Sequence, residues 1–124
     1  MTRTVLLVDD DDNVLKTISP MLIDAGFNVV AVTEARVGLA ELQAQSIDLI
    51  ITDILMPDME GIEFIMKLRA KSPDVPIIAI SGGGRISNAN FLTFAKKLGA
   101  NAVLEKPFGR DELLDVVTRT LAAS

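Results

Sequence analysis

The sequence contains no cysteine, no histidine, no tryptophan and no tyrosine. Without cysteine, the chain can form no disulfide and offers no thiol nucleophile. Without histidine, it has no imidazole acid or base, no imidazole metal ligand and no phosphohistidine. Tryptophan and tyrosine are the usual platforms on which nucleic-acid bases stack, and both are missing. Several common classes of catalytic and binding site are therefore excluded.

Long apolar runs and an excess of positive charge are absent as well. No run approaches the ~20 apolar residues of a membrane-spanning helix, and Val5–Val8 is too short for the core of a signal peptide. Lysine and arginine total 12 against 17 aspartates and glutamates, a net charge of −5, which disfavours direct binding to nucleic acid. We therefore expect a cytoplasmic protein with no membrane partner and no direct nucleic-acid partner.

What the 124 residues do contain is enough apolar material, 49%, for one packed domain. Five short runs are nearly continuous in apolar residues, which is typical of strands buried on both faces. They are Thr4–Val8, Asn28–Val32, Asp48–Thr52, Pro76–Ile80 and Ala100–Leu104. A segment of helical period follows each run, and this alternation predicts a parallel sheet with helices on both faces. We expect an α/β, doubly wound five-stranded parallel sheet with five helices, spanning residues 1–124.

Polar residues gather after the expected strands. Asp9 and Asp10 follow the first run, Asp53 the third, Ser81 the fourth and Lys106 the fifth. Ligands of open parallel sheets bind outside the carboxyl ends of the strands. We therefore expect these side chains to form one anionic site for a cation and a phosphoryl group.

The acidic run Asp9–Asp12 has two interpretations. It is either a solvated turn in which Asp11 or Asp12 caps the next helix, or part of a metal site. Carboxylates this close repel one another unless a divalent cation neutralises them, and oxygen ligands suit Mg²⁺. Asp53 is correspondingly either a second ligand or a nucleophile that forms an acyl phosphate.

Four segments, in order, resemble the receiver domain of bacterial two-component response regulators, and the resemblance covers essentially the whole chain. They are Val5–Asp10, Asp48–Pro57 with Gly61, Pro76–Ser81, and Gly99–Ala100 with Lys106–Phe108. The resemblance implies a flavodoxin-like fold with strand order 2-1-3-4-5. Periodicity does not predict this order.

The resemblance also implies a role for each site residue. Asp53 would be the phosphoacceptor, and Mg²⁺ would be bound by Asp9, Asp10, Asp53 and the backbone carbonyl of Leu55. Ser81 and Lys106 would contact the phosphoryl group. The bond between Lys106 and Pro107 would be cis.

The chain departs from the family pattern at two places. Val103 stands where the family often has a tyrosine or phenylalanine, so the output switch is expected to be weaker or to use other residues. Phe91 and Phe94 are candidates, although their helical stripe also fits a core position. The segment between Ser81 and Lys106 is a few residues longer than in compact receivers. It holds Gly82–Gly84, which fit no phosphate-loop spacing, and a mobile loop is expected before the fourth helix.

The leading hypothesis is a stand-alone receiver domain that accepts a phosphoryl group from a histidine kinase or phosphotransfer protein. It would signal to a protein partner through its fourth helix, fifth strand and fifth helix, without turnover of an external substrate. The alternative is an interaction module that works without phosphorylation, which Val103 favours. An aspartyl phosphatase is disfavoured because Leu55 supplies no second acid, and a flavin protein because aspartates occupy the place of its phosphate loop.

We expect the phosphorylated state to be long-lived. By the resemblance, Leu55 and Gly83 stand where a side chain would orient the attacking water, and neither can do so. Decay of the radiolabelled phosphoryl group at neutral pH measures the lifetime. A lifetime of seconds or less would contradict this expectation.

Overall fold

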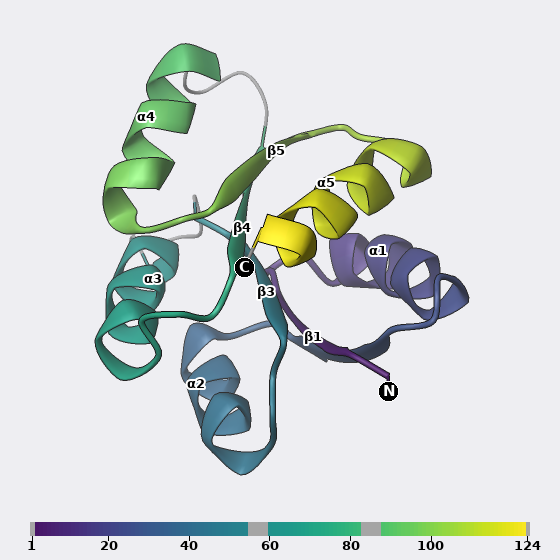
Figure 1. The fold of residues 1–124 in the computed structure, drawn as a ribbon, viewed down its shortest axis with the longest axis horizontal. Helices are drawn as coiled ribbons and strands as arrows, with labels where there is room; N and C mark the ends of the chain where they lie inside the picture. The colour runs from purple at the N-terminus through teal and green to yellow at the C-terminus, as the bar shows by residue number, and fades with distance from the viewer. Residues whose placement is uncertain (1, 55–59, 83–87, 124) are drawn as a thin grey trace.

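The computed structural model describes residues 2–54, 60–82 and 88–123, with the backbone alone for 60–62 and 88–92. Five strands alternate with five helices along the chain (Figure 1). The strands are β1 (Thr4–Val8), β2 (Asn28–Val32), β3 (Leu49–Asp53), β4 (Ile77–Gly82) and β5 (Ala102–Lys106). The helices are α1 (Asp12–Asp24), α2 (Ala35–Ala44), α3 (Glu60–Lys71), α4 (Asn88–Leu98) and α5 (Arg110–Ala123).

All five strands are parallel and lie in the order β2-β1-β3-β4-β5. The predicted fold class and strand order are both confirmed. In this order β1 lies beside β3, with Val8 opposite Thr52. The residues that follow Val8 and Thr52 in the sequence therefore emerge side by side at the carboxyl edge of the sheet.

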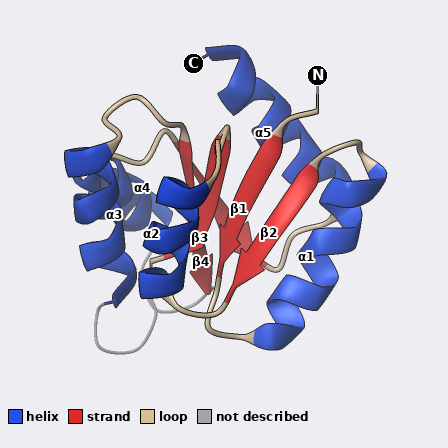
Figure 2. Ribbon diagram, turned by 90° about the horizontal axis from the view of Figure 1, so that it is seen from below, coloured by secondary structure: helices blue, strands red, loops and turns tan. Residues whose placement is uncertain are grey.

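Helices cover both faces of the sheet, with α1 and α5 on one side and α2, α3 and α4 on the other (Figures 1 and 2). Successive residues of a strand point to opposite faces, so each strand contributes to two separate cores. Leu6 and Ile50 pack toward α3 and its Phe64, whereas Leu7 and Ile51 pack toward α1 and α5. Among the described helices, none combines the length and apolarity that crossing a bilayer requires.

Two glycines end helices in the same way. Gly26 (φ +99°) and Gly99 (φ +110°) adopt a left-handed conformation after α1 and α4. In each case the next residue donates to a carbonyl five residues back, at 3.1 Å from Phe27 to Leu22 and 3.0 Å from Ala100 to Ala95. This hydrogen bond satisfies one of the last carbonyls of each helix, and the left-handed backbone that it requires favours glycine.

The later strands begin and end further along the chain than expected. The run Ala100–Leu104 was expected as a strand, but Ala100 completes the end of α4, so β5 begins at Ala102. β3 and β4 likewise run one and two residues past the expected Thr52 and Ile80. The ladder continues through polar residues because backbone pairing, not side-chain apolarity, defines a strand.

Arg69 ties three segments together at the amino edge of the sheet. Its Nε and Nη2 donate to the Gly99 carbonyl at 2.9 and 2.7 Å, and its Nη1 donates to the Val75 carbonyl at 2.6 Å. Nη2 also donates to Asn101 Oδ1 at 2.7 Å, and the same oxygen accepts the Ile77 N–H at 2.9 Å. The planar guanidinium can reach all these acceptors at once, which a lysine ammonium cannot.

We predict that Arg69→Ala lowers the free energy of unfolding by about 2–3 kcal/mol, because several partly buried acceptors lose their donor together. Urea unfolding followed by circular dichroism measures the change. Arg36→Ala is the matched control, since Arg36 is exposed and pairs with the exposed Glu34 at 3.4 Å. Its expected effect is within about 0.5 kcal/mol. Equal effects of the two substitutions would show that the Arg69 contacts carry little stability.

Candidate functional site

Three carboxylates meet at the carboxyl edge of the sheet. Asp9 follows β1, Asp53 ends β3, and oxygens of Asp9, Asp10 and Asp53 all lie within 4.8 Å of one another. Asp9 is fully buried and Asp53 is 6% exposed, whereas Asp10 faces solvent. The structure thus brings the three predicted aspartates together, with one of them open to an incoming ligand.

Lys106, the last residue of β5, reaches across to this cluster. Its Nζ lies 3.0 Å from Asp9 Oδ2 and 3.1 Å from Asp53 Oδ2. The ammonium is therefore shared between two carboxylates that are distant in sequence. The sequence analysis expects Lys106 to contact a phosphoryl group. The structure adds an ion pair between Lys106 and Asp9. The peptide bond from Lys106 to Pro107 is cis, as expected.

Local backbone contacts orient the acidic residues. The Asp11 N–H donates to Asp9 Oδ1 at 2.9 Å, and Asp11 Oδ1 accepts the Asn13 N–H at 2.9 Å. Asp11 is therefore the N-cap of α1, as one interpretation of the acidic run proposed. The capping interpretation therefore holds for Asp11, while Asp9 and Asp10 lie beside Asp53 in an arrangement that could hold a metal ion.

Two further polar side chains are buried beside the cluster. Ser81 lies in β4, next to β3, and is 3% exposed. Thr52 is fully buried, and its hydroxyl donates to the Asp53 carbonyl oxygen at 3.1 Å. Sequence reasoning gave Thr52 no role, although a hydroxyl inside an apolar run, one residue before the key aspartate, was a usable signal. Leu55 and Gly83 lie outside the described residues. Of the loop expected with Gly82–Gly84, Gly82 instead ends β4, where it pairs with Lys106, and the rest lies outside the described residues.

The surroundings of the site raise the pKa values of both Asp9 and Lys106, with opposite effects on their charged forms. Burial raises the pKa of Asp9 above its usual value, although the Asp11 N–H and the Lys106 ammonium act in the opposite direction. Burial alone would lower the pKa of Lys106, but its hydrogen bonds and ion pairs with Asp9 and Asp53 outweigh this and raise it. Lys106 therefore stays charged near neutral pH, while ionised Asp9 is costly to keep buried.

The donor set fits Mg²⁺. Three carboxylates and one ammonium leave the ionised cluster with two net negative charges, which a divalent cation would balance. All the ligand atoms are oxygens, and the exposed Asp10 leaves room for the water molecules that Mg²⁺ retains. The carbonyl of Leu55, predicted as a further ligand, is outside the described residues.

Comparison with known proteins identifies the family of this chain and supports its fold. A sequence model described as "Response regulator receiver domain" matches residues 5–118. The chain belongs to the response regulator receiver domain family. It is thus homologous to the regulators of two-component systems. Receiver domains generally bind Mg²⁺ at an acidic pocket and interact with a histidine kinase or a phosphotransfer protein.

Relatives of this receiver domain include longer regulators. The C4-dicarboxylate transport transcriptional regulatory protein DctD of Rhizobium meliloti is 36% identical over 116 residues, which are 94% of this chain and 25% of that protein. The transcriptional regulatory protein FixJ of Bradyrhizobium diazoefficiens is 32% identical over 113 residues, which are 91% of this chain and 54% of that protein. The receiver domain thus spans about a quarter to a half of these curated relatives.

Solved structures of similar length have the same fold. The CheY-like receiver domain protein of Methanospirillum hungatei superposes with a TM-score of 0.88 at 30% identity, covering 99% of this chain and 96% of that one. Chemotaxis protein CheY4 of Vibrio cholerae gives a TM-score of 0.87 at 33% identity, covering 97% and 99%. At these identities the likeness extends beyond the fold to homology.

The raised pKa of Asp9 predicts a pH dependence. A carboxyl whose pKa is higher in the folded state stabilises the fold below its unfolded value of 3.8, and this contribution is lost as pH rises through the folded pKa. Without divalent cations, the stability of Asp9→Asn relative to the unsubstituted protein should therefore increase over the range in which pH rises above 3.8 and through the raised pKa of Asp9. Urea unfolding across this range in a chelating buffer measures the difference. A constant or falling difference would contradict the assigned pKa direction.

Proposed function

We propose that the receiver domain accepts a phosphoryl group on Asp53, with Mg²⁺, from a histidine kinase or phosphotransfer protein. The observation that carries this proposal is the position of Asp53. Its carboxylate lies within a cluster of three, yet one oxygen is paired with the Lys106 ammonium at 3.1 Å. A nucleophilic carboxylate with a lysine and a divalent-cation site beside it has the charge neutralisation that phosphoryl transfer needs.

In the proposed transfer, an Asp53 oxygen attacks the phosphorus of a phosphohistidine on the donor protein. A new P–O bond forms and the P–N bond breaks, and its electron pair leaves with the donor's imidazole, which takes up a proton from water. Asp9 and Asp10, with Asp53, would hold Mg²⁺, which would neutralise negative charge on the phosphoryl oxygens.

Lys106 and Ser81 would donate hydrogen bonds to the phosphoryl group once it is on Asp53. The Lys106 ammonium is half-buried and already within hydrogen-bond distance of Asp53, so a short shift would let it donate to a phosphoryl oxygen. Ser81, at the end of the neighbouring strand β4, carries a hydroxyl that would donate to another. Two donors from different strands would couple the phosphorylated state to the positions of β4 and β5.

The signal would pass to a protein partner rather than to an external substrate. A phosphoryl group adds about −1.5 to −2 charges at neutral pH and can bias a two-state surface. We assign the partner surface to α4, β5 and α5, because Lys106 ends β5 itself and Ser81 lies on β4, the strand paired with β5. The cytoplasmic location and the absence of external turnover stay predictions from the sequence.

One observation favours a second candidate, a module that binds partners without phosphorylation. Val103 on β5 is half-buried against the core beneath α4. A valine has no ring to swing between an inner and an outer position, so the surface above it would respond less to phosphorylation. Phe94 is half-buried against the same core, while the side chain of Phe91 is outside the described part of the chain.

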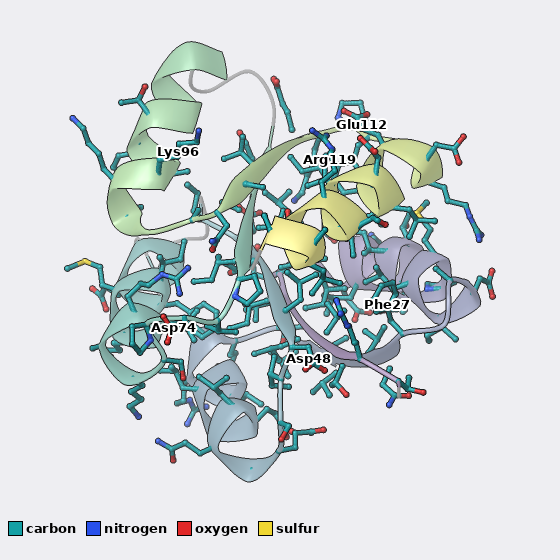
Figure 3. The ribbon with its side chains drawn as sticks, viewed as in Figure 1. Phe27, Asp48, Asp74, Lys96, Glu112 and Arg119 are labelled. Atoms are coloured by element: carbon teal, nitrogen blue, oxygen red, sulfur yellow. The ribbon has the colours of Figure 1, made fainter. Side chains whose placement is uncertain are left out.

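The test is incubation with acetyl phosphate and Mg²⁺, followed by intact-protein mass measurement. A single phosphoryl adduct is expected, and Asp53→Asn should abolish it because the amide cannot form an acyl phosphate. Asp74→Asn is the matched control, since Asp74 is exposed in the loop between α3 and β4, at the amino edge of the sheet (Figure 3). It should retain full labelling.

The alternative results separate the two candidates. Labelling that persists in Asp53→Asn would remove Asp53 from its proposed role. No labelling, together with Mg²⁺ binding measured by calorimetry, would favour the phosphorylation-independent module.

A further inference from the structure

Thr52 carries a hydroxyl group into the interior of the sheet, one residue before Asp53. Its side chain is fully buried, and its partners in the register of β3 with the two neighbouring strands are Val8 and Ala79. Both partners are apolar and fully buried. A valine would fill this position with no polar group to satisfy, whereas a buried hydroxyl costs free energy unless it is hydrogen-bonded. Packing alone therefore does not account for a threonine here.

The hydroxyl is bound to the backbone of Asp53. Thr52 Oγ1 donates to the Asp53 carbonyl oxygen at 3.1 Å. The N–H of the same peptide unit belongs to Ile54, and it donates to the Ile80 carbonyl at 3.3 Å. The peptide bond that follows Asp53 is thus held at its oxygen by the Thr52 side chain and at its nitrogen by β4.

This hydrogen bond lies where the pairing of the sheet comes to an end. The register of β1 with β3 ends at Val8 and Thr52, whereas that of β3 with β4 continues to Asp53 and Ile80. The Asp53 carbonyl is therefore one residue past the last pair that β3 makes with β1. A local bond from a side chain to this carbonyl restricts rotation about the bond between the Cα and the carbonyl carbon of Asp53.

Thr52 and Asp53 point to opposite faces of the sheet, because successive residues of a strand alternate. Thr52 shares the face of Ile50, which packs toward α3. Its hydroxyl meets Asp53 at the backbone carbonyl and not at the carboxylate. Any effect of Thr52 on the chemistry of the site is therefore that of a positioning residue, not of a catalytic residue.

We propose that the Thr52 hydroxyl positions Asp53 for phosphoryl transfer by fixing the peptide bond that follows it. The Asp53 carboxylate already has the Lys106 ammonium at 3.1 Å, and a misplacement of about 1 Å can slow such a reaction about a hundredfold. A carboxylate on a fixed backbone has less freedom to lose before it reaches the reactive geometry. The inference rests on the proposed function, because it names a further residue for the same reaction.

The experiment compares two pairs of chains that differ in the hydroxyl group. The unsubstituted chain and Thr52→Val form the first pair, and Thr52→Ser and Thr52→Ala, which both lack the γ-methyl group, form the second. The initial rate of acetyl phosphate labelling, with Mg²⁺ in excess, should fall about tenfold in Thr52→Val and in Thr52→Ala, because each loses the hydrogen bond. Thr52→Ser keeps the donor and should retain most of the rate.

The matched control is Thr120→Val, since Thr120 is also a buried threonine but lies near the end of α5, outside the carboxylate cluster. It should be labelled at the rate of the unsubstituted chain. Urea unfolding of every variant accompanies the rates, because a purely structural role would lower stability without slowing the folded protein.

Amide hydrogen exchange of Ile54, followed by NMR, reports on the peptide bond itself. The Ile54 N–H belongs to the peptide unit whose oxygen Thr52 holds, so its exchange should be about tenfold faster in Thr52→Val. In Thr120→Val the exchange of Ile54 should be unchanged.

Three results would overturn the inference. These are equal labelling rates of Thr52→Val and the unsubstituted chain, equal rates of Thr52→Ser and Thr52→Ala, and Ile54 exchange that Thr52→Val leaves unchanged. If Thr52→Val does not fold, the serine and alanine variants decide the question by the same two measurements.

The unsubstituted chain keeps this inference separate from the proposed function. Normal labelling of that chain and of every variant refutes the role of Thr52 alone. No labelling of the unsubstituted chain refutes phosphoryl transfer, and the exchange of Ile54 then decides whether Thr52 holds the peptide bond.

Discussion

The shared Lys106 ammonium is the interaction on which the site depends. It lies 3.0 Å from Asp9 and 3.1 Å from Asp53, two carboxylates that would otherwise repel each other with little solvent to screen them. One ammonium does not balance the three carboxylates that meet there once they are ionised. Burial raises the pKa of Asp9, and the remaining negative charge makes the cluster suitable for a divalent cation.

The backbone ladder of the sheet makes this interaction possible. Lys106 is 97 residues from Asp9 and 53 from Asp53, yet parallel pairing places the ends of β1, β3 and β5 along one edge. Apolar residues drive this arrangement, because β1 and β3 are buried on both faces and can satisfy their backbone groups only by pairing. The energy of the two cores therefore offsets the cost of holding charges together.

At the opposite edge of the sheet, Arg69 likewise connects segments that are distant in the sequence. Its guanidinium joins the end of α3, the loop before β4 and the turn from α4 to β5. The same contacts fix the side chain of Asn101, which precedes β5. The two arrangements differ in chemistry, since Lys106 pairs with charged carboxylates whereas Arg69 binds neutral oxygens. The ion pairs of Lys106 suit a site whose charge changes, whereas the hydrogen bonds of Arg69 suit a rigid structural element.

The sequence by itself determined the element order, the parallel sheet and the gathering of Asp9, Asp10, Asp53 and Lys106 at one edge, because apolar runs and the polar residues after them are local features of the chain. The strand order came from the family resemblance, and the ends of β4 and β5 came from the structure. Two residues show the limit of local information. Nothing near Lys106 in the sequence reveals its pairing with Asp9, and nothing near Arg69 reveals its bonds to Gly99. Such contacts depend on which distant segments the fold brings together, and only the tertiary structure decides that.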